Sequence, residues 1–421
     1  MDKHIIDSAK RCLQCRDPRC SAGCPVATPI KEAIQLLLSS QVEQAGNLLF
    51  SNNPLSLVCS YICHQENQCE GHCVLGRKGM PIQVSAIERY ISDFYLSLFT
   101  PIPSQKSKGK IAVIGSGPAG IVVAFLLAAK DYDVTIFEGY DRIGGILRYG
   151  IPEFRLPKNI LDRIAKMLVA AGVTIRPNTT IGTSIVVDEL FRDGFDAVFM
   201  GTGVWRPLKL NIKGESLGHV HYAIDYLKNP NVYNLGRRVM VIGAGNVAMD
   251  VARSALRHGS REATIICRRG ESSISARASE VEFAKIDGVM FEFNKIAVEI
   301  TEQGVLLADS TVRSAEDGAE ILEAVSGTEQ LHEADSVIIA ISQGPRALIV
   351  SSTEGIHVKE GGLVVTDGAG HTTRDGVFAS GDVVTGAKTV VEAVKVSRLV
   401  AEAIDEYVSG KRPIKEPLLS P

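Results

Sequence analysis

The pattern of hydrophobic and polar positions changes once along the chain, near residue 109. Before that point, apolar residues recur at helical spacing in "IKEAIQLLLSSQVEQAGNLLF" (30–50) and "IQVSAIERYISDFYLSLF" (82–99), which predicts a helical head. The next stretch, "TPIPSQKSKG", is rich in proline, serine and lysine and predicts a linker. After it, short apolar runs alternate with helical patterns, which indicates parallel α/β domains.

Two glycine turns stand out in this second part. "KIAVIGSGPAG" and "RRVMVIGAGNVAMDVARSAL" each carry an apolar strand into a glycine turn and then a helix. The small residues that define the turns are Gly115, Gly117 and Gly120 in the first and Gly243, Gly245 and Ala248 in the second. Such residues allow a tight turn and bring a helix N-terminus close to a pyrophosphate. We therefore expect two dinucleotide sites, with Pro118 and Ala119 completing the first turn.

Charged residues after the following strands distinguish the two sites. Glu138 ends the strand "YDVTIFE", where an acidic group would accept a hydrogen bond from a ribose hydroxyl. The corresponding second strand, "EATIICRR", ends in Arg268 and Arg269. A cation there suits a 2′-phosphate, which favours NADP over NAD, and Arg277 is a weaker phosphate candidate. The alternative for all of these side chains is a solvated surface charge.

A late stretch, "GVFASGDVVTGAKTVVEAV", supports a flavin at the first turn. A strand leads to Gly381 and Asp382, whose carboxylate would orient the ribityl or pyrophosphate end. A helix beginning near Lys388, Thr389 and Val390 would direct its positive end at the flavin pyrimidine ring. We therefore predict FAD at the first turn and NADP(H) at the second.

Several motifs together resemble one family. "GGILRYGIPEFRLPK", "GNVAMDVARSALRHG", the Gly-Asp stretch and the spaced cysteines are similar to the FAD- and NADPH-binding small subunit of bacterial glutamate synthase. The NADPH half of dihydropyrimidine dehydrogenase and the large subunit of the bifurcating NADH-dependent ferredoxin:NADP oxidoreductase resemble it too. The resemblance runs from about Arg11 to Ala403.

The resemblance implies an α/β chain with a helical N-terminal iron–sulfur domain followed by two Rossmann-like domains, the NADPH domain inserted in the FAD domain. The implied bounds are 1–99 for the head with two [4Fe–4S] clusters, 100–108 for the linker, 109–205 and 342–421 for the FAD domain, and 206–341 for the NADP(H) domain.

The same resemblance implies roles for individual residues. The backbone of Gly144 and Gly145 would lie against the isoalloxazine ring, with Leu147 and Arg148 in the same matched motif. The matched NADPH motif also contains Asn246, Val247 and Asp250. Two positions depart from the family: Tyr61 replaces an arginine, and Ser342 stands where the family tends to have glycine.

Eight of the nine cysteines lie between Cys12 and Cys73. The first run, C-x2-C-x4-C-x3-C-P, resembles the bacterial ferredoxin run with a wider central gap. Three thiolates close in sequence can hold three corners of a cubane, and the fourth corner needs a ligand from elsewhere. We therefore predict two ligand sets, Cys12, Cys15, Cys20 and Cys73 for the first [4Fe–4S] cluster, and Cys24, Cys63 and Cys69 for the second.

The fourth ligand of the second cluster has two candidates. Spacing favours Cys59, and the family pattern favours Glu88. A pair of zinc sites, a disulfide framework and a thiol exchanger are weaker alternatives for the head as a whole. The ninth cysteine, Cys267, is expected to be a buried strand residue.

The charge balance and the apolar runs bear on the partners and the location of the protein. The 45 basic and 48 acidic residues nearly balance, so no field selects nucleic acid or an anionic membrane. No apolar run approaches the ~20 residues of a membrane span. The N-terminus lacks a hydrophobic signal region, so we expect a cytoplasmic protein.

The predicted function is an oxidoreductase subunit. NADP(H) would exchange hydride with FAD, without a catalytic acid–base residue because the flavin itself accepts the hydride. Single electrons would pass through the clusters to or from partner subunits, such as a glutamate synthase large subunit, or to ferredoxin. The alternatives are a subunit of a bifurcating transhydrogenase, the input subunit of a split dihydropyrimidine dehydrogenase, or an assembly module with a vestigial nucleotide site.

Overall fold

The computed structural model describes residues 3–314 and 320–410, and the chain divides into two compact units. One unit contains the chain up to Leu147, Glu153–Val204 and the chain from Pro345 onward. The other contains Arg148–Pro152 and Trp205–Gly344. The α/β class is confirmed, since each unit has a parallel sheet with helices. The exact domain bounds stay a prediction.

The head of the first unit is helical, as predicted. Its elements are α1 (Lys3–Lys10), α2 (Arg19–Ala22), α3 (Ile30–Leu38), α4 (Val42–Asn52), α5 (Ser56–Ile62), the 3-10 turns η1 (Gln65–Asn67) and η2 (Val74–Arg77), and α6 (Val84–Leu98). The stretch with helical spacing over 30–50 forms two helices, α3 and α4. Ser40 adopts φ +61°, a left-handed conformation that ends a helix and turns the chain.

A five-stranded parallel sheet follows in the first unit. Its order is β16 (Val377–Ala379), β4 (Ala197–Met200), β1 (Lys110–Ile114), β2 (Asp133–Phe137) and β3 (Thr174–Arg176). The remaining helices of this part of the chain are α7 (Pro118–Ala128), α8 (Ile146–Tyr149), α9 (Lys158–Ala170), α10 (Val187–Arg192), α14 (Leu348–Ser351), α15 (Asp382–Thr385) and α16 (Val390–Gly410). Because β1 is apolar on both faces, it lies at the centre of this sheet.

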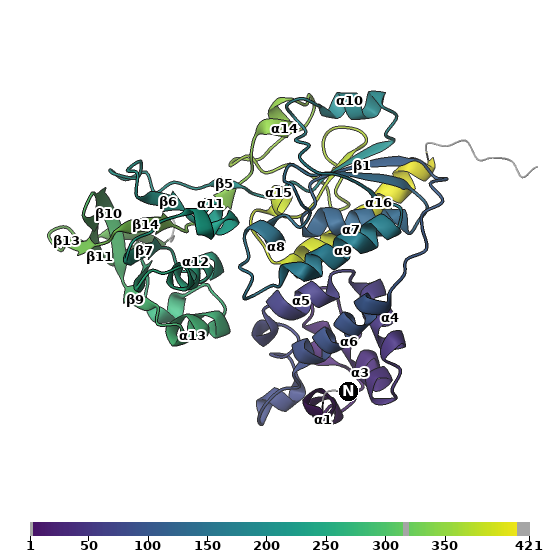
Figure 1. Ribbon diagram of the computed structural model, residues 1–421, viewed down its shortest axis with the longest axis horizontal. Helices are drawn as coiled ribbons and strands as arrows, with labels where there is room; N and C mark the ends of the chain where they lie inside the picture. Colours follow the sequence, from purple (N-terminus) through teal and green to yellow (C-terminus); the bar gives the residue numbers. More distant parts are fainter. Residues whose placement is uncertain (1–2, 315–319, 411–421) are drawn as a thin grey trace, which may run out of the picture. The chain divides into compact units, whose positions relative to one another are not determined.

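Helix α7 is apolar on all sides because neighbours cover every side of it. Nine of its eleven residues are buried, and α16 runs alongside it (Figure 1). An aromatic joint connects it to the head: Phe50, Tyr95 and Phe99 cluster with Phe125 of α7, and the Phe50 and Phe125 ring centroids lie 5.1 Å apart. An ion pair of 2.5 Å between Arg163 and Asp93 adds a polar contact.

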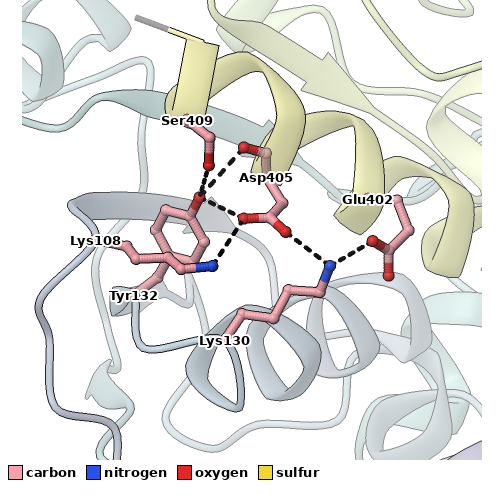
Figure 2. Close-up of polar contacts among 6 residues, drawn as sticks. All are labelled: Lys108, Lys130, Tyr132, Glu402, Asp405 and Ser409. Carbon is pink, nitrogen blue, oxygen red and sulfur yellow. Dashed lines mark hydrogen bonds and ion pairs between the residues drawn. The ribbon is translucent and has the colours of Figure 1, made fainter. Parts of the chain in front are cut away.

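A polar network holds the C-terminal half of α16 against the segment that contains Lys130 and Tyr132 (Figure 2). The buried Tyr132 donates its hydroxyl to Asp405 at 2.7 Å, and Lys130 pairs with Asp405 at 2.8 Å and also with Glu402. Burial alone would raise the pKa of Asp405, but hydrogen bonds from Lys130 and Tyr132 outweigh it and lower that pKa below the ordinary 3.8. The network therefore stabilises the fold through a carboxylate in its charged form.

The second unit repeats the parallel arrangement. Its sheet runs β6 (Val220–Tyr222), β14 (Ser336–Ile339), β7 (Arg238–Ile242), β8 (Glu262–Cys267) and β9 (Met290–Phe293). The helical elements of this unit are α11 (Ala223–Lys228), η3 (Pro230–Val232), α12 (Asn246–Arg257), η4 (Glu271–Ser273) and α13 (Ala278–Ile286). An antiparallel sheet joins β10 (Lys295–Thr301), β11 (Gly304–Ser314), β12 (Glu320–Ala324) and β13 (Gln330–Glu333), and a two-stranded one joins β5 (Arg206–Pro207) to β15 (Gln343–Gly344). Cys267 is buried in β8, as expected.

Candidate functional site

The three glycines of the first turn meet different surroundings. A Cβ atom on Gly115, whose φ is +92°, would lie 2.7 Å from the carbonyl oxygen of Gly201. A Cβ atom on Gly120 would lie 2.0 Å from the carbonyl oxygen of Gly115. A Cβ atom on Gly117 would have no protein atom nearer than 4.0 Å. The first and third glycines therefore serve the protein's own packing, and the second leaves open the space that a pyrophosphate needs.

The loop of the matched flavin motif lies against this turn. Gly145 has φ +51°, and a Cβ atom there would be 2.7 Å from the Cα atom of Gly117. The amide of Gly144 donates to the carbonyl oxygen of Ser116 at 3.0 Å. Leu147 is buried next in the chain, whereas Arg148 belongs to the short segment grouped with the second unit.

Glu138 is buried at the end of β2. Its carboxylate accepts hydrogen bonds from the amide of Ser116 at 3.0 Å, from the Ser116 hydroxyl, and from the amide of Tyr140 at 2.9 Å. A carboxylate has about four acceptor positions, so one remains for an outside donor. The surface-charge alternative does not fit a side chain with 5% exposure, and the ribose contact stays a prediction.

The Gly-Asp stretch adjoins the same turn. A Cβ atom on Gly381, with φ +74°, would lie 3.1 Å from the Cβ atom of Ala119. The carboxylate of Asp382 accepts from the Lys388 amide at 3.2 Å, and burial raises the pKa of Asp382 to about 6. Thr389 caps α16 through a reciprocal pair of hydrogen bonds with Glu392, and Val390 is the first residue of this helix.

The second turn repeats the division of roles among its small residues. A Cβ atom on Gly243, with φ +136°, would lie 2.3 Å from the carbonyl oxygen of Ala340. A Cβ atom on Gly245 would have only the Ser275 hydroxyl within 4 Å, at 3.7 Å. Gly245 is the N-cap of α12, so an open space again lies at a helix N-terminus.

The residues predicted to bind phosphate or to belong to the NADPH motif differ in their exposure. Arg268 is exposed just after β8, and Arg269 is half-buried beside it. Arg277 is 9% exposed, and its amide donates to the Asn246 side chain at 3.0 Å, which places it at the turn. Within α12, Val247 is partly buried and Asp250 is buried. Two consecutive arginines after β8 and a third at the start of α13 therefore belong to the unit that carries the second turn.

The first cysteine group is assembled around one pocket. Cys12, Cys15, Cys20 and Cys73 line it together with apolar residues such as Ile30 and Ile82. Burial, and then the neighbouring Cys15 and Cys73, raise the pKa of the Cys12 thiol. Burial, Cys73 and Cys12 likewise raise the pKa of Cys20. Cysteines far apart in sequence thus face one another, as a cluster with ligands from both runs requires.

The second cysteine group comes from three loops: Cys24 follows α2, Cys63 directly follows α5 and Cys69 follows η1, while the candidate Glu88 lies on α6. The pKa of Cys69 is raised by burial first and then by Glu88, Glu70 and Cys24. The pKa of Cys63 is raised by a hydrogen bond with Cys59, by burial, and by nearby Glu88 and Cys69. Burial raises the pKa of Glu88 to about 8. The structure therefore brings Cys24, the last cysteine of the first run, beside Cys69.

Both candidates for the remaining ligand lie near Cys63. Cys59 is 3% exposed and accepts a hydrogen bond from the side-chain Nδ2 of Asn53 at 3.3 Å, so its sulfur already has a protein partner. Within the described residues, no group of three or more His, Cys, Asp or Glu side chains is arranged to hold a metal ion. No described helix is long and apolar enough to span a membrane.

Three features of these sites were absent from the sequence-based prediction. Ser116 donates two hydrogen bonds to Glu138, but it occupies a position between Gly115 and Gly117 at which the glycine motif allows any residue, so the motif does not predict this contact. The cap of α16 was readable, because Thr389 and Glu392 have the spacing of a capping box. The stacking of Arg89 on Tyr61, at 3.7 Å, joins two helices and has no local signal.

Comparisons with known proteins agree with this organisation. Residues 1–98 match the family model described as dihydropyrimidine dehydrogenase domain II, 4Fe-4S cluster, and residues 109–397 match pyridine nucleotide-disulphide oxidoreductase. The glutamate synthase [NADPH] small chain of Azospirillum brasilense is 32% identical over 97% of this chain and 90% of its own length. The chain belongs to the glutamate synthase small chain family.

Other relatives of this family serve different enzymes. The NAD-dependent dihydropyrimidine dehydrogenase subunit PreT of Salmonella typhimurium is 32% identical over 96% of this chain and 94% of its own length. The NADP(+)-dependent formate dehydrogenase subunit beta of Moorella thermoacetica is 34% identical over 92% of this chain, but over only 60% of its own length.

Solved structures confirm the fold of the nucleotide-binding part. FprA of Mycobacterium tuberculosis in complex with NADPH has a TM-score of 0.61 at 19% identity, covering 72% of this chain and 85% of FprA. The family assignment confirms an oxidoreductase with an iron–sulfur head and a flavin- and nicotinamide-dependent body, as predicted. The number of clusters and the ligand of each remain predictions.

Proposed function

We propose that this NADPH-dependent FAD and iron–sulfur oxidoreductase subunit transfers electrons between NADP(H) and a partner subunit, in the manner of a glutamate synthase small chain. Bound FAD supplies the conversion between a hydride pair and single electrons. The observation that carries the proposal is the pair of open glycine positions, Gly117 and Gly245, in a chain whose head gathers two cysteine groups.

The roles of the residues follow from their surroundings. In the first unit, Gly117 leaves space for the FAD pyrophosphate, and Glu138 and Asp382 hold the ribose and ribityl regions. In the second unit, Gly245 and the N-terminus of α12 bind the NADP(H) pyrophosphate, and Arg268 and Arg269 bind the 2′-phosphate.

The second cysteine group is proposed to lie on the flavin side of the head. The Thr389 hydroxyl, and more weakly Lys388 and His64, lower the pKa of Glu392 at the start of α16, so His64 lies near that helix end. His64 directly follows Cys63, a proposed ligand of the second cluster. Electrons would therefore reach the second cluster site before the first.

Anaerobic spectroscopy tests the proposal. Adding NADPH to the reconstituted chain should bleach the flavin first and reduce the iron–sulfur centres afterwards. If NADPH leaves the flavin oxidised, either the assignment of NADP(H) as the nucleotide or the proposed direction of electron transfer is wrong. An NADPH:dye reductase activity would exclude an assembly module with a vestigial nucleotide site.

The partner is a separate question. The proposed partner is a glutamate-forming large subunit, with dihydropyrimidine dehydrogenase and transhydrogenase subunits as the alternatives. PreT supports the first alternative, because this chain covers 94% of its length. Identification of the subunits that purify with the native protein decides between them.

A further inference from the structure

One cation next in sequence to a proposed ligand of the second cluster has no carboxylate partner among the residues that the structure describes. Arg89 follows Glu88 on α6, and it takes part in no ion pair within the ranges 3–314 and 320–410. Its Nε atom is buried and has no hydrogen-bond acceptor there. Taking a guanidinium out of water without a counter-charge is unfavourable, so its placement calls for a reason.

Two contacts hold the guanidinium in place. Its Cζ atom lies 3.7 Å from the centroid of the Tyr61 ring, a cation–π arrangement. Its Nη2 atom donates to the carbonyl oxygen of Ser60 at 3.2 Å. Tyr61 lies two residues before Cys63, and Glu88 one residue before Arg89. The charge is therefore fixed between two chain segments that each carry a proposed ligand of the second cluster.

A purely structural role explains only part of this arrangement. The bond to Ser60 satisfies a carbonyl near the C-terminal end of α5, and basic side chains favour such positions. A helix cap, however, needs neither a buried Nε atom nor an aromatic ring beneath the guanidinium. The missing counter-charge is supplied when thiolates and a carboxylate at this site hold a cluster, since that assembly is anionic.

We propose that Arg89, held flat on Tyr61, is the fixed counter-charge of the second iron–sulfur cluster and raises its reduction potential. The inference rests on the proposed function, which places that cluster on Cys24, Cys63, Cys69 and Glu88. Reduction adds one electron to the cluster, and a nearby positive charge stabilises the added negative charge. Arginine stays protonated throughout, so this contribution does not vary with pH.

The experiment is a redox titration of the full chain, reconstituted anaerobically with iron and sulfide and followed by electron paramagnetic resonance. The variant Glu88→Cys first identifies the signal of the second cluster. In Arg89→Met, the ratio of reduced to oxidised second cluster at a fixed potential should fall about tenfold, equal to 59 mV for a one-electron couple. The first cluster should titrate as in the native chain.

Further variants separate charge from structure. Arg89→Lys keeps the charge and should lose less than half of the effect in millivolts, and Tyr61→Phe keeps the ring and should change nothing. Arg163→Met is the matched control, because Arg163 also contacts α6 but is already paired with Asp93. It should leave both potentials unchanged. If Arg89→Met does not fold, Tyr61→Leu removes the support of the guanidinium and should lower the same potential.

The outcomes that overturn the inference are distinct. A second cluster whose potential does not move in Arg89→Met, while the melting temperature of the chain falls, would make Arg89 a helix cap only. Equal shifts of both clusters would also overturn it. A native chain that binds iron and sulfide for one cluster only would refute the proposed second site, and the inference with it.

Discussion

The first glycine turn allows its two roles to be tested by one pair of substitutions, Gly117→Ala and Gly120→Ala. Gly117 has φ −68° and ψ −174°, a conformation that alanine adopts freely, and its new methyl group would meet no protein atom within 4 Å except the Gly201 oxygen at that limit. The apo chain should therefore be as stable as the native one, or more stable by about 0.4–1 kcal/mol, because alanine restricts the unfolded chain.

The same methyl group would fill the space proposed for the FAD pyrophosphate. We expect the affinity of Gly117→Ala for FAD to fall at least about 100-fold, roughly 2.8 kcal/mol. In Gly120→Ala, the contact to the Gly115 oxygen must open from 2.0 Å to at least 3.0 Å. That overpacking should lower the free energy of unfolding of the apo chain by about 1–3 kcal/mol or more.

Two measurements separate these expectations. Titration of the apo variants with FAD, followed by flavin fluorescence, gives the affinity, and urea unfolding of the same samples gives the stability. The iron–sulfur absorbance of Gly117→Ala should match that of the native chain. Normal FAD binding by Gly117→Ala, or native stability of Gly120→Ala, would refute the division of roles within the turn.

Three other substitutions probe separate features. Ser342→Gly should raise the free energy of unfolding by about 1 kcal/mol, because Ser342 has φ +92°; thermal unfolding beside Ser342→Ala, which should bring no gain, checks it. Alanine at Arg268 and Arg269 should raise KM for NADPH about tenfold or more and leave KM for NADH unchanged; equal losses in steady-state assays would oppose a 2′-phosphate site. Asp405→Asn should cost about 1.5–3 kcal/mol at pH 7. Because the folded pKa of Asp405 is depressed, its stabilisation is present above its ordinary 3.8 and fades as pH falls through the folded value. The loss measured by urea unfolding should therefore shrink as the pH is lowered below 3.8, and a loss independent of pH would contradict the ion-pair explanation.

The nucleotide-binding body was predictable because its signals are local. A strand, a glycine turn and a helix follow one another within about twenty residues, and the structure places β1 and α7 around Gly117 as the motif requires. The departure at Ser342 was likewise visible in the sequence. Its left-handed backbone shows why glycine suits that position.

The head was less predictable because its contacts are not local. Spacing separated the cysteines into two runs, and the grouping of Cys24 with Cys69 was predicted by analogy with ferredoxin, although it is the packing of the helices that brings the two residues together. The choice between Cys59 and Glu88 remains a prediction for the same reason, since both lie near Cys63. The division of residues 30–50 into two helices has no signal in the apolar spacing, which continues across Ser40.

The aromatic joint between the head and α7 has a consequence for the life of the chain in a cell. Phe50, Tyr95 and Phe99 lose their cover if α7 unfolds, and Phe125 loses its own if the head unfolds. The clusters bind only the folded head, so their binding stabilises the folded state of the head. Because the aromatic joint packs the head against α7, this stabilisation extends to the flavin-binding part. A chain starved of iron should therefore melt at a lower temperature even when it is saturated with FAD, and proteases should remove it faster. Iron supply would then set the lifetime of the whole subunit.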